Sequence, residues 1–235
     1  LEERPAPTIT APTDAVVKVV AACVCGSDLW PYRGVNAVEA PRPIGHEFVG
    51  VVEEVGADVR TVRAGQFVIA PFVYSCGECA HCRYGVQTSC VKGGRGWGGA
   101  DGDGEPTAAC QGELVRVPYA DVGPIKIENG LTDEQVLFLS DIFPTGYMAA
   151  ENCDIQPGDT VAVWGCGPVG QFAIASANLL GADQLIGIDR FPERRVERRD
   201  YPQRASRRRA AGLSRKFERC RAGRAAAHPA WHRAA

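Results

Sequence analysis

The sequence lacks any unbroken apolar run of the roughly 18 to 20 residues that a membrane-spanning helix requires. It also shows no internal repeat, and its first residues, Leu1 to Pro7, are charged and proline-rich rather than typical of a signal peptide. We therefore expect a soluble, cytoplasmic protein with no membrane partner. Its 235 residues are 45% hydrophobic, which is enough for one large domain or two ordinary ones.

The net charge of -2 conceals two differently composed pieces that join near Phe191. Residues 1–190 carry 12 basic and 24 acidic side chains, whereas residues 191–235 carry 14 basic and 4 acidic ones. The arginines of the second piece, including Arg207, Arg208 and Arg209, could neutralise nucleic-acid phosphates. No groove-reading or aromatic-interleaved pattern accompanies them, so a solvated tail is the favoured interpretation and nucleic acid the less favoured partner.

Short β-branched runs separated by Gly and Pro fill the first half of the chain and predict a β-rich, barrel-like domain. These runs are Val16–Val20, Phe48–Val55, Gln66–Ala70 and Glu113–Val117. From Leu131 to Ala150 the pattern becomes helical, with Thr132 as the helix-start signal before the acidic residues of a first turn. We expect a helix there that leads out of the first domain.

The next segment reads as one βαβ unit. A buried strand over Asp159–Trp164 precedes a glycine-rich turn, an Ala- and Leu-rich helix over Gln171–Leu180 follows, and a second strand covers Gln184–Ile188. The turn has the pattern G-x-G-x-x-G, and an acidic residue, Asp189, stands 19 residues after its last glycine. In this context the pattern predicts a dinucleotide site with the pyrophosphate at the helix N-terminus.

The residues predicted to contact the dinucleotide lie in the turn and at the end of the second strand: Gly165, Gly167, Pro168, Val169, Gly170, Asp189 and Arg190. Asp189 would accept hydrogen bonds from the adenine ribose and repel a 2′-phosphate, which favours NAD over NADP. Arg190 is the one residue that argues for NADP.

The ten cysteines are clustered, which favours reduced thiolates that bind metal over a disulfide framework. Cys76, Cys79, Cys82 and Cys90 have the spacing C-x2-C-x2-C-x7-C. Four thiolates within fifteen residues can surround one Zn²⁺ tetrahedrally, and closed sulfur sites of this kind are structural. Two disulfides or free thiols are the alternative, and His81 inside the loop is expected to be a solvated neighbour.

A second constellation pairs Cys25-Gly26-Ser27-Asp28 with Gly45-His46-Glu47-x-x-Gly50. A thiolate and an imidazole about twenty residues apart, each beside a glycine, suit two of the three protein ligands of an open catalytic zinc. Either residue alone would more often belong to a protein core.

These motifs, in this order and spacing, resemble those of the zinc-containing medium-chain alcohol dehydrogenases over roughly residues 8–192. The resemblance implies a catalytic zinc at Cys25 and His46 and a structural zinc at the four-cysteine loop. The third catalytic ligand should precede a Phe-x-Thr-Gly-Tyr-like segment, and here Asp141 takes that position, as in the branch that looks like glutathione-independent formaldehyde dehydrogenase. A helix-end carboxylate is the alternative reading of Asp141.

The same resemblance assigns roles around the proposed zinc. Asp28 would bind the free ring nitrogen of His46 and fix its tautomer. Glu47 would be a nearby or transient oxygen donor, with an ordinary capped or solvated acid as the alternative. Ser27 would relay the substrate proton, and Trp30 occupies a position where many members have a histidine for that relay.

The implied fold is α+β: a GroES-like β-barrel domain over residues 1–150, an incomplete Rossmann domain with a parallel sheet over 151–192, and an unrelated tail over 193–235. The implied reaction transfers hydride between a small-molecule alcohol or aldehyde hydrate and NAD. A catalytically inactive zinc-binding fragment is the alternative function. The chain could also form a homo-oligomer.

Overall fold

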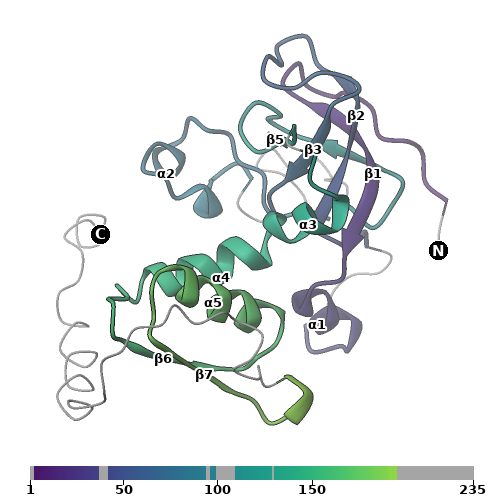
Figure 1. The fold of residues 1–235 in the computed structure, drawn as a ribbon. Helices are drawn as coiled ribbons and strands as arrows, with labels where there is room; N and C mark the ends of the chain where they lie inside the picture. Colours follow the sequence, from purple (N-terminus) through teal and green to yellow (C-terminus); the bar gives the residue numbers. More distant parts are fainter. Residues whose placement is uncertain (1–2, 37–41, 94–95, 99–108, 129, 195–235) are drawn as a thin grey trace.

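The computed structural model describes residues 3–36, 42–93, 96–98, 109–128 and 130–194 of the chain. Its larger part is a five-stranded antiparallel sheet with the order β4-β1-β2-β3-β5 (Figure 1). The strands are β1 Ala15–Cys23, β2 Glu47–Val55, β3 Phe67–Ala70, β4 Leu114–Val117 and β5 Ile125–Lys126. The four predicted strands are therefore confirmed, and β5 is an addition of two residues.

The sheet has a buried core in which valine is the most frequent residue. Val17 on β1, Val115 on the neighbouring β4 and Val68 on β3 are completely buried. Trp97 packs against the rings of Phe48 and Tyr74, with ring centroids 5.4 Å apart in both pairs. Within the described residues the strand order is open, because the edge strands β4 and β5 do not pair with each other.

One-turn helices connect the strands and carry chemistry-bearing residues. They are η1 Gly26–Asp28, α1 Leu29–Tyr32, α2 Ala80–Arg83 and η2 Gln87–Ser89, with η4 Pro192–Arg194 near the end of the described chain. The sequence pattern did not predict them, because a single turn is too short to show helical periodicity.

The single helix expected over Leu131–Ala150 is wrong. The structure has α3 Asp133–Leu137, the 3-10 turn η3 Phe138–Ser140 and then α4 Ile142–Glu151. Pro144 explains the break, because it has no N–H to bond the carbonyl of Ser140 in a continuous helix, whereas the first turn of α4 needs none. The carbonyl of Ser140 instead accepts the N–H of Phe72 at 3.0 Å, just after β3. Thr132 caps α3 as predicted.

The βαβ unit is confirmed: β6 Thr160–Trp164, α5 Pro168–Leu179 and β7 Gln184–Ile188. The two strands are parallel, with register from Thr160↔Gln184 to Trp164↔Ile188. α4 lies along α5 on one side of this small sheet (Figure 1). Two parallel strands agree with an incomplete Rossmann sheet, while the domain limits at residues 150 and 192 stay predictions.

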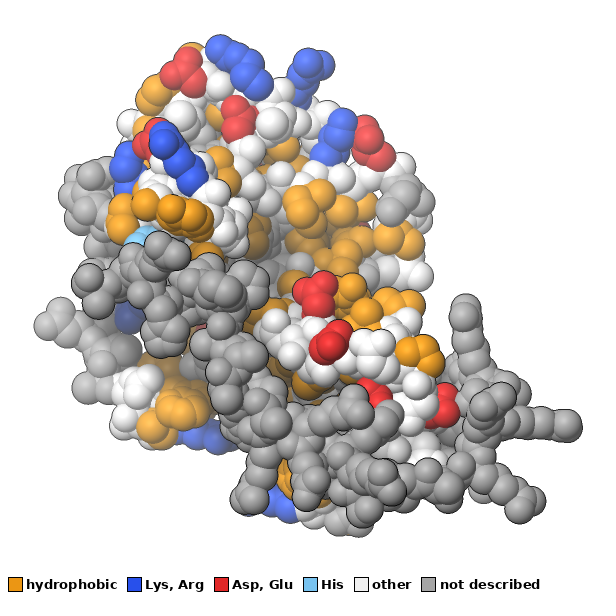
Figure 2. All heavy atoms as spheres, turned by 90° about the vertical axis from the view of Figure 1, so that its left-hand side faces the viewer, with side chains coloured by type: hydrophobic (Ala, Val, Ile, Leu, Met, Phe, Trp, Pro, Cys, Tyr) orange, Lys and Arg blue, Asp and Glu red, His pale blue; other side chains and the backbone are white. Residues whose placement is uncertain are grey.

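On the face shown in Figure 2, the described part carries hydrophobic side chains together with acidic and basic ones. Large hydrophobic side chains are exposed on the small sheet, including Trp164 and Ile186. In the described part of the chain, no helix is long and apolar enough to cross a membrane. The arginines at 207–209 lie outside the described residues.

Candidate metal centres

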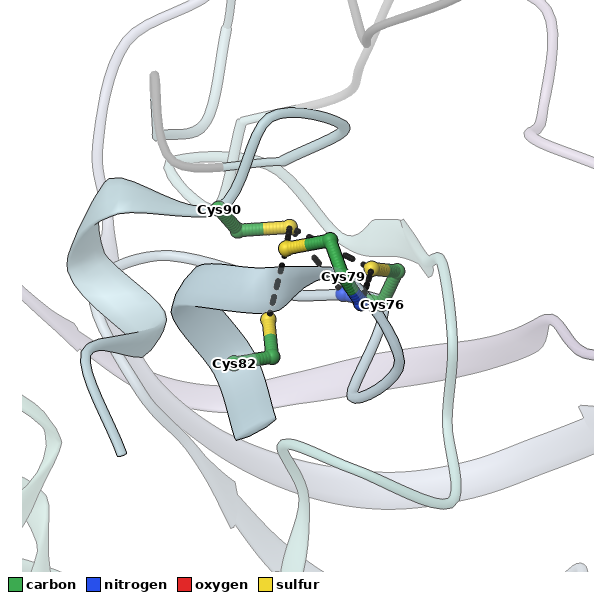
Figure 3. Close-up of side chains that lie close together, drawn as sticks. All are labelled: Cys76, Cys79, Cys82 and Cys90. Carbon is green, nitrogen blue, oxygen red and sulfur yellow. Dashed lines mark hydrogen bonds between the residues drawn. The ribbon is translucent and has the colours of Figure 1, made fainter. Parts of the chain in front are cut away.

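The four cysteines of the C-x2-C-x2-C-x7-C loop converge on one point (Figure 3). Cys79 caps α2, Cys82 lies within it, and Cys90 follows η2. The sulfur of Cys79 lies 3.5 Å from that of Cys82 and 4.0 Å from that of Cys90, which is 3.6 Å from Cys76. Sulfurs placed tetrahedrally at about 2.3 Å from one zinc ion lie about 3.8 Å apart, so this donor set fits zinc.

Backbone N–H groups favour the thiolate of Cys79, whereas burial raises the pKa of Cys82. The N–H groups of Cys82 and Val91 lower the pKa of Cys79 to about 6, which favours the thiolate. Tyr119 packs against both the cysteine cluster and the core of the large sheet, so the loop is attached to the sheet. His81 is exposed and lies outside this donor set, as expected.

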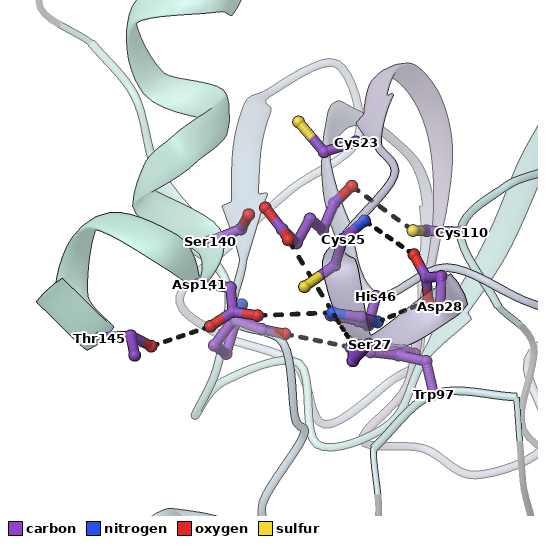
Figure 4. Close-up of polar contacts among 12 residues, drawn as sticks. Cys23, Cys25, Ser27, Asp28, His46, Trp97, Cys110, Ser140, Asp141 and Thr145 are labelled. Atoms are coloured by element: carbon purple, nitrogen blue, oxygen red, sulfur yellow. Dashed lines mark hydrogen bonds and ion pairs between the residues drawn. The ribbon is translucent and has the colours of Figure 1, made fainter. Parts of the chain in front are cut away.

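The second cluster lies where two antiparallel strands end beside each other (Figure 4). Cys23 at the end of β1 pairs with Glu47 at the start of β2, so Cys25 and His46 come together just beyond the sheet. Asp141 arrives from the break between η3 and α4. One possible ligand atom from each of Cys25, His46, Glu47 and Asp141 lies within 4.8 Å of the others.

A carboxylate lies beside each ring nitrogen of His46. Its Nε2 lies 3.4 Å from Oδ2 of Asp141, and its Nδ1 lies 3.3 Å from Oδ1 of Asp28. The contact with Asp141, helped by the charge of Asp28, raises the pKa of His46. The other oxygen of Asp28 accepts the backbone N–H of Cys25 at 2.9 Å, so one carboxylate orients both residues.

Glu47 is the least solvated member of the cluster. Its side chain is 1% exposed, and neither carboxylate oxygen has a hydrogen-bond partner among the described residues. Burial raises the pKa of Glu47. Its Oε1 lies 3.9 Å from Nε2 of His46. A buried carboxylate that accepts no hydrogen bond, facing a thiol, an imidazole and a second carboxylate, fits a divalent metal site.

Ser27 and Thr145 add hydroxyl groups at the edge of the cluster. Oγ of Ser27 lies 3.5 Å from Nε2 of His46, on the exposed side. The hydroxyl of Thr145 donates to Oδ1 of Asp141 at 2.9 Å (Figure 4). Sequence reasoning missed Thr145, although its spacing of four residues from Asp141 at a helix start was a usable signal.

The residues predicted to bind a dinucleotide also lie together. Gly165 and Gly167 form the turn after β6, and Pro168 and Val169 open α5. Gly170 allows close packing of helix and turn, because a Cβ there would lie 1.9 Å from the carbonyl oxygen of Gly165.

Asp189 closes the glycine-rich turn. Its Oδ2 accepts the N–H of Cys166 at 2.8 Å and its Oδ1 that of Phe191 at 2.9 Å. These bonds, first that from Phe191, lower the pKa of Asp189. The guanidinium of Arg190 stacks over the ring of Phe191, 4.5 Å from its centroid.

Comparison with known proteins places these features in one family. The model of the alcohol dehydrogenase GroES-like domain matches residues 11–127. The chain is 42% identical to a medium chain reductase/dehydrogenase, ucsI, from Acremonium sp over 205 residues, covering 83% of this chain and 67% of that protein. It is 37% identical over 188 residues to a glutathione-independent formaldehyde dehydrogenase from Pseudomonas aeruginosa, covering 76% and 47% of the two chains.

Among solved structures, the alcohol dehydrogenase TADH from Thermus sp. ATN1 superposes with a TM-score of 0.76 at 40% identity, covering 82% of this chain and 55% of that one. The chain spans about half the length of most curated relatives it matches. The large antiparallel sheet is thus the GroES-like part predicted from the sequence, and the small parallel sheet corresponds to the incomplete Rossmann part. The chain belongs to the family of zinc-type, medium-chain alcohol dehydrogenases.

Proposed function

We propose that this chain carries the metal centres of a zinc-dependent oxidoreductase that transfers hydride between an alcohol, or an aldehyde hydrate, and NAD. One observation carries the proposal: Cys25, His46 and Asp141 converge beside the buried, unsatisfied carboxylate of Glu47. Family membership supports the reaction class. A small-molecule substrate follows from it, whereas association into a homo-oligomer is a separate proposal.

In this proposal Cys25, His46 and Asp141 hold the catalytic zinc, with Glu47 as an additional oxygen donor. Bound zinc supplies Lewis-acid polarisation of a substrate oxygen. Asp28 holds Nδ1 of His46 and thereby directs Nε2 toward the cluster. The exposed hydroxyl of Ser27 lies near enough to the cluster to pass a substrate proton toward solvent.

Trp30 does not contribute to proton transfer in this mechanism. Its indole has no acceptor for a relayed proton, and the side chain is largely exposed. The proton released from substrate therefore leaves from Ser27 through water.

The four-cysteine loop holds the structural zinc in the proposal. Four sulfur donors fill a tetrahedral shell and leave no position for substrate. Its connection to the sheet through Tyr119 suits a stabilising role.

We further propose that the turn after β6 binds the pyrophosphate of NAD at the N-terminus of α5. Asp189 disfavours a 2′-phosphate, and the stacking of Arg190 on Phe191 holds that cation beside the turn. The second candidate function is an inactive zinc-binding fragment. It is favoured by the observation that the described part contains only two strands of the proposed nucleotide-binding sheet. A domain boundary near residue 150, just before the end of α4, agrees with both candidates.

Nucleotide titration separates the two candidates. Trp164 is 72% exposed and directly precedes the glycine-rich turn, so its fluorescence reports on binding there. We expect millimolar NAD to quench the zinc-loaded chain, and a Trp164→Phe variant to lose that signal. A folded chain that shows neither quenching nor calorimetric heat with NAD would support the inactive fragment.

A further inference from the structure

We propose that Thr145 is a positioning residue that fixes the carboxylate of Asp141 so that only Oδ2 faces the metal. The inference rests on the proposed function, because it assigns Asp141 to the catalytic zinc.

Asp141 occupies the N-cap of α4, where an aspartate normally accepts a backbone N–H of the first helical turn. Its side chain makes no such bond. The carboxylate instead lies between the hydroxyl of Thr145 and the ring of His46 (Figure 4).

The two carboxylate oxygens of Asp141 have different partners. Oδ2 lies 3.4 Å from Nε2 of His46, in the cluster, while Oδ1 accepts the hydroxyl of Thr145 at 2.9 Å. Thr145 is itself held by its backbone N–H, which donates to the carbonyl of Asp141 at 3.0 Å. The hydroxyl therefore occupies one oxygen and leaves the other for a metal.

Without the hydrogen bond from Thr145, the carboxylate of Asp141 could adopt two other orientations. A free carboxylate at this position would be attracted by the N–H groups and the positive end of α4. It could also turn both oxygens toward the metal and change the coordination number. The bond from Thr145 opposes both rearrangements.

The test uses the full chain with Zn²⁺ and Co²⁺ as probes. Thr145→Val keeps the β-branched shape and removes the hydroxyl, while Thr145→Ser keeps the hydroxyl. Zinc affinity is measured by competition with a chromogenic chelator, and the coordination of Co²⁺ by its visible d–d absorption. Thr145→Ala, which also lacks the hydroxyl and suits a helix, replaces the valine variant if that one does not fold.

We expect the wild type to bind two zinc equivalents. In Thr145→Val, the zinc affinity of the Cys25–His46–Asp141 site should fall by about 10- to 100-fold, and the Co²⁺ spectrum of that site should change. The four-cysteine site should keep its affinity, and Thr145→Ser should restore the other site and its spectrum. If the Cys25–His46–Asp141 site keeps its zinc affinity and its Co²⁺ spectrum in the valine or alanine variant, this inference alone is overturned. A wild-type chain that takes up a single equivalent overturns the proposed function as well.

Discussion

At the scale of single residues, Asp14 connects the N-terminal segment to the large sheet. Its Oδ2 accepts the guanidinium of Arg116 at 2.9 Å and the backbone N–H groups of Thr10 and Ala11 at 3.2 and 3.0 Å. Both charged side chains are buried. A buried pair is costly to break, because the remaining charge loses its partner away from water.

Asp14→Ala should therefore lower the free energy of unfolding by about 3 to 5 kcal/mol, measured by urea denaturation of the zinc-saturated chain. Asp58→Ala is the matched control, because Asp58 pairs with Arg60 at 3.9 Å on the surface. That change should cost less than about 1 kcal/mol. Equal losses in the two variants would contradict the role given to the buried pair.

Sequence reasoning reached most of the residues of both clusters because zinc ligands have restrictive spacing. The four cysteines are close along the chain. Cys25 follows one predicted strand and His46 precedes another. It could not show that Glu47 has no hydrogen-bond partner, nor that Thr145 contacts Asp141. Both facts depend on side-chain orientation, which a linear pattern does not determine.

At the scale of elements, the crossing of α4 and α5 depends on Gly146. A Cβ at this position would lie 2.7 Å from the backbone nitrogen of Ala173 and 2.9 Å from the carbonyl carbon of Phe172. Phe143 and Phe172 pack edge to face beside the crossing, with ring centroids 5.5 Å apart. The glycine thus allows two helices to approach at backbone contact.

Gly146→Ala should destabilise the chain by about 1 to 3 kcal/mol, although alanine is the better helix former, because overpacking separates the helices. Thermal unfolding followed by circular dichroism measures the effect. The control is Gly112→Ala, where a Cβ meets nothing within 4 Å. A loss in the control as large as that in Gly146→Ala would refute the packing explanation.

Elements with a long periodic pattern were predicted well, and short ones were not. The strands and helix of the βαβ unit differ from expectation by only a few residues. The break between α3 and α4 was missed because the apolar pattern continues through it, although Pro144 was a sequence signal against one continuous helix. β5 has two residues, too few to show alternation.

At the scale of the whole molecule, the four-cysteine loop should couple metal content to stability. Zinc that binds the folded loop and not the unfolded chain adds about 2.7 kcal/mol at a free concentration of 100 times its dissociation constant. Cys82→Ser should remove the part of the gain that comes from the loop in a thermal-shift titration, leaving only the stabilisation by zinc at the Cys25–His46–Asp141 cluster. Cys153→Ser, at an exposed cysteine outside both clusters, should keep the whole gain. A full gain in Cys82→Ser would show that the stabilising ion binds elsewhere.

The three proposed catalytic ligands lie on different structural elements. Cys25 and His46 adjoin strands of the antiparallel sheet, whereas Asp141 begins the helix that packs on α5, and α5 starts at the nucleotide turn. A rotation of the paired helices would therefore stretch or compress the triangle of donors. Under the proposed function, nucleotide occupancy and ion affinity would be thermodynamically linked, so the factor by which NAD alters zinc affinity must equal the factor by which zinc alters NAD affinity.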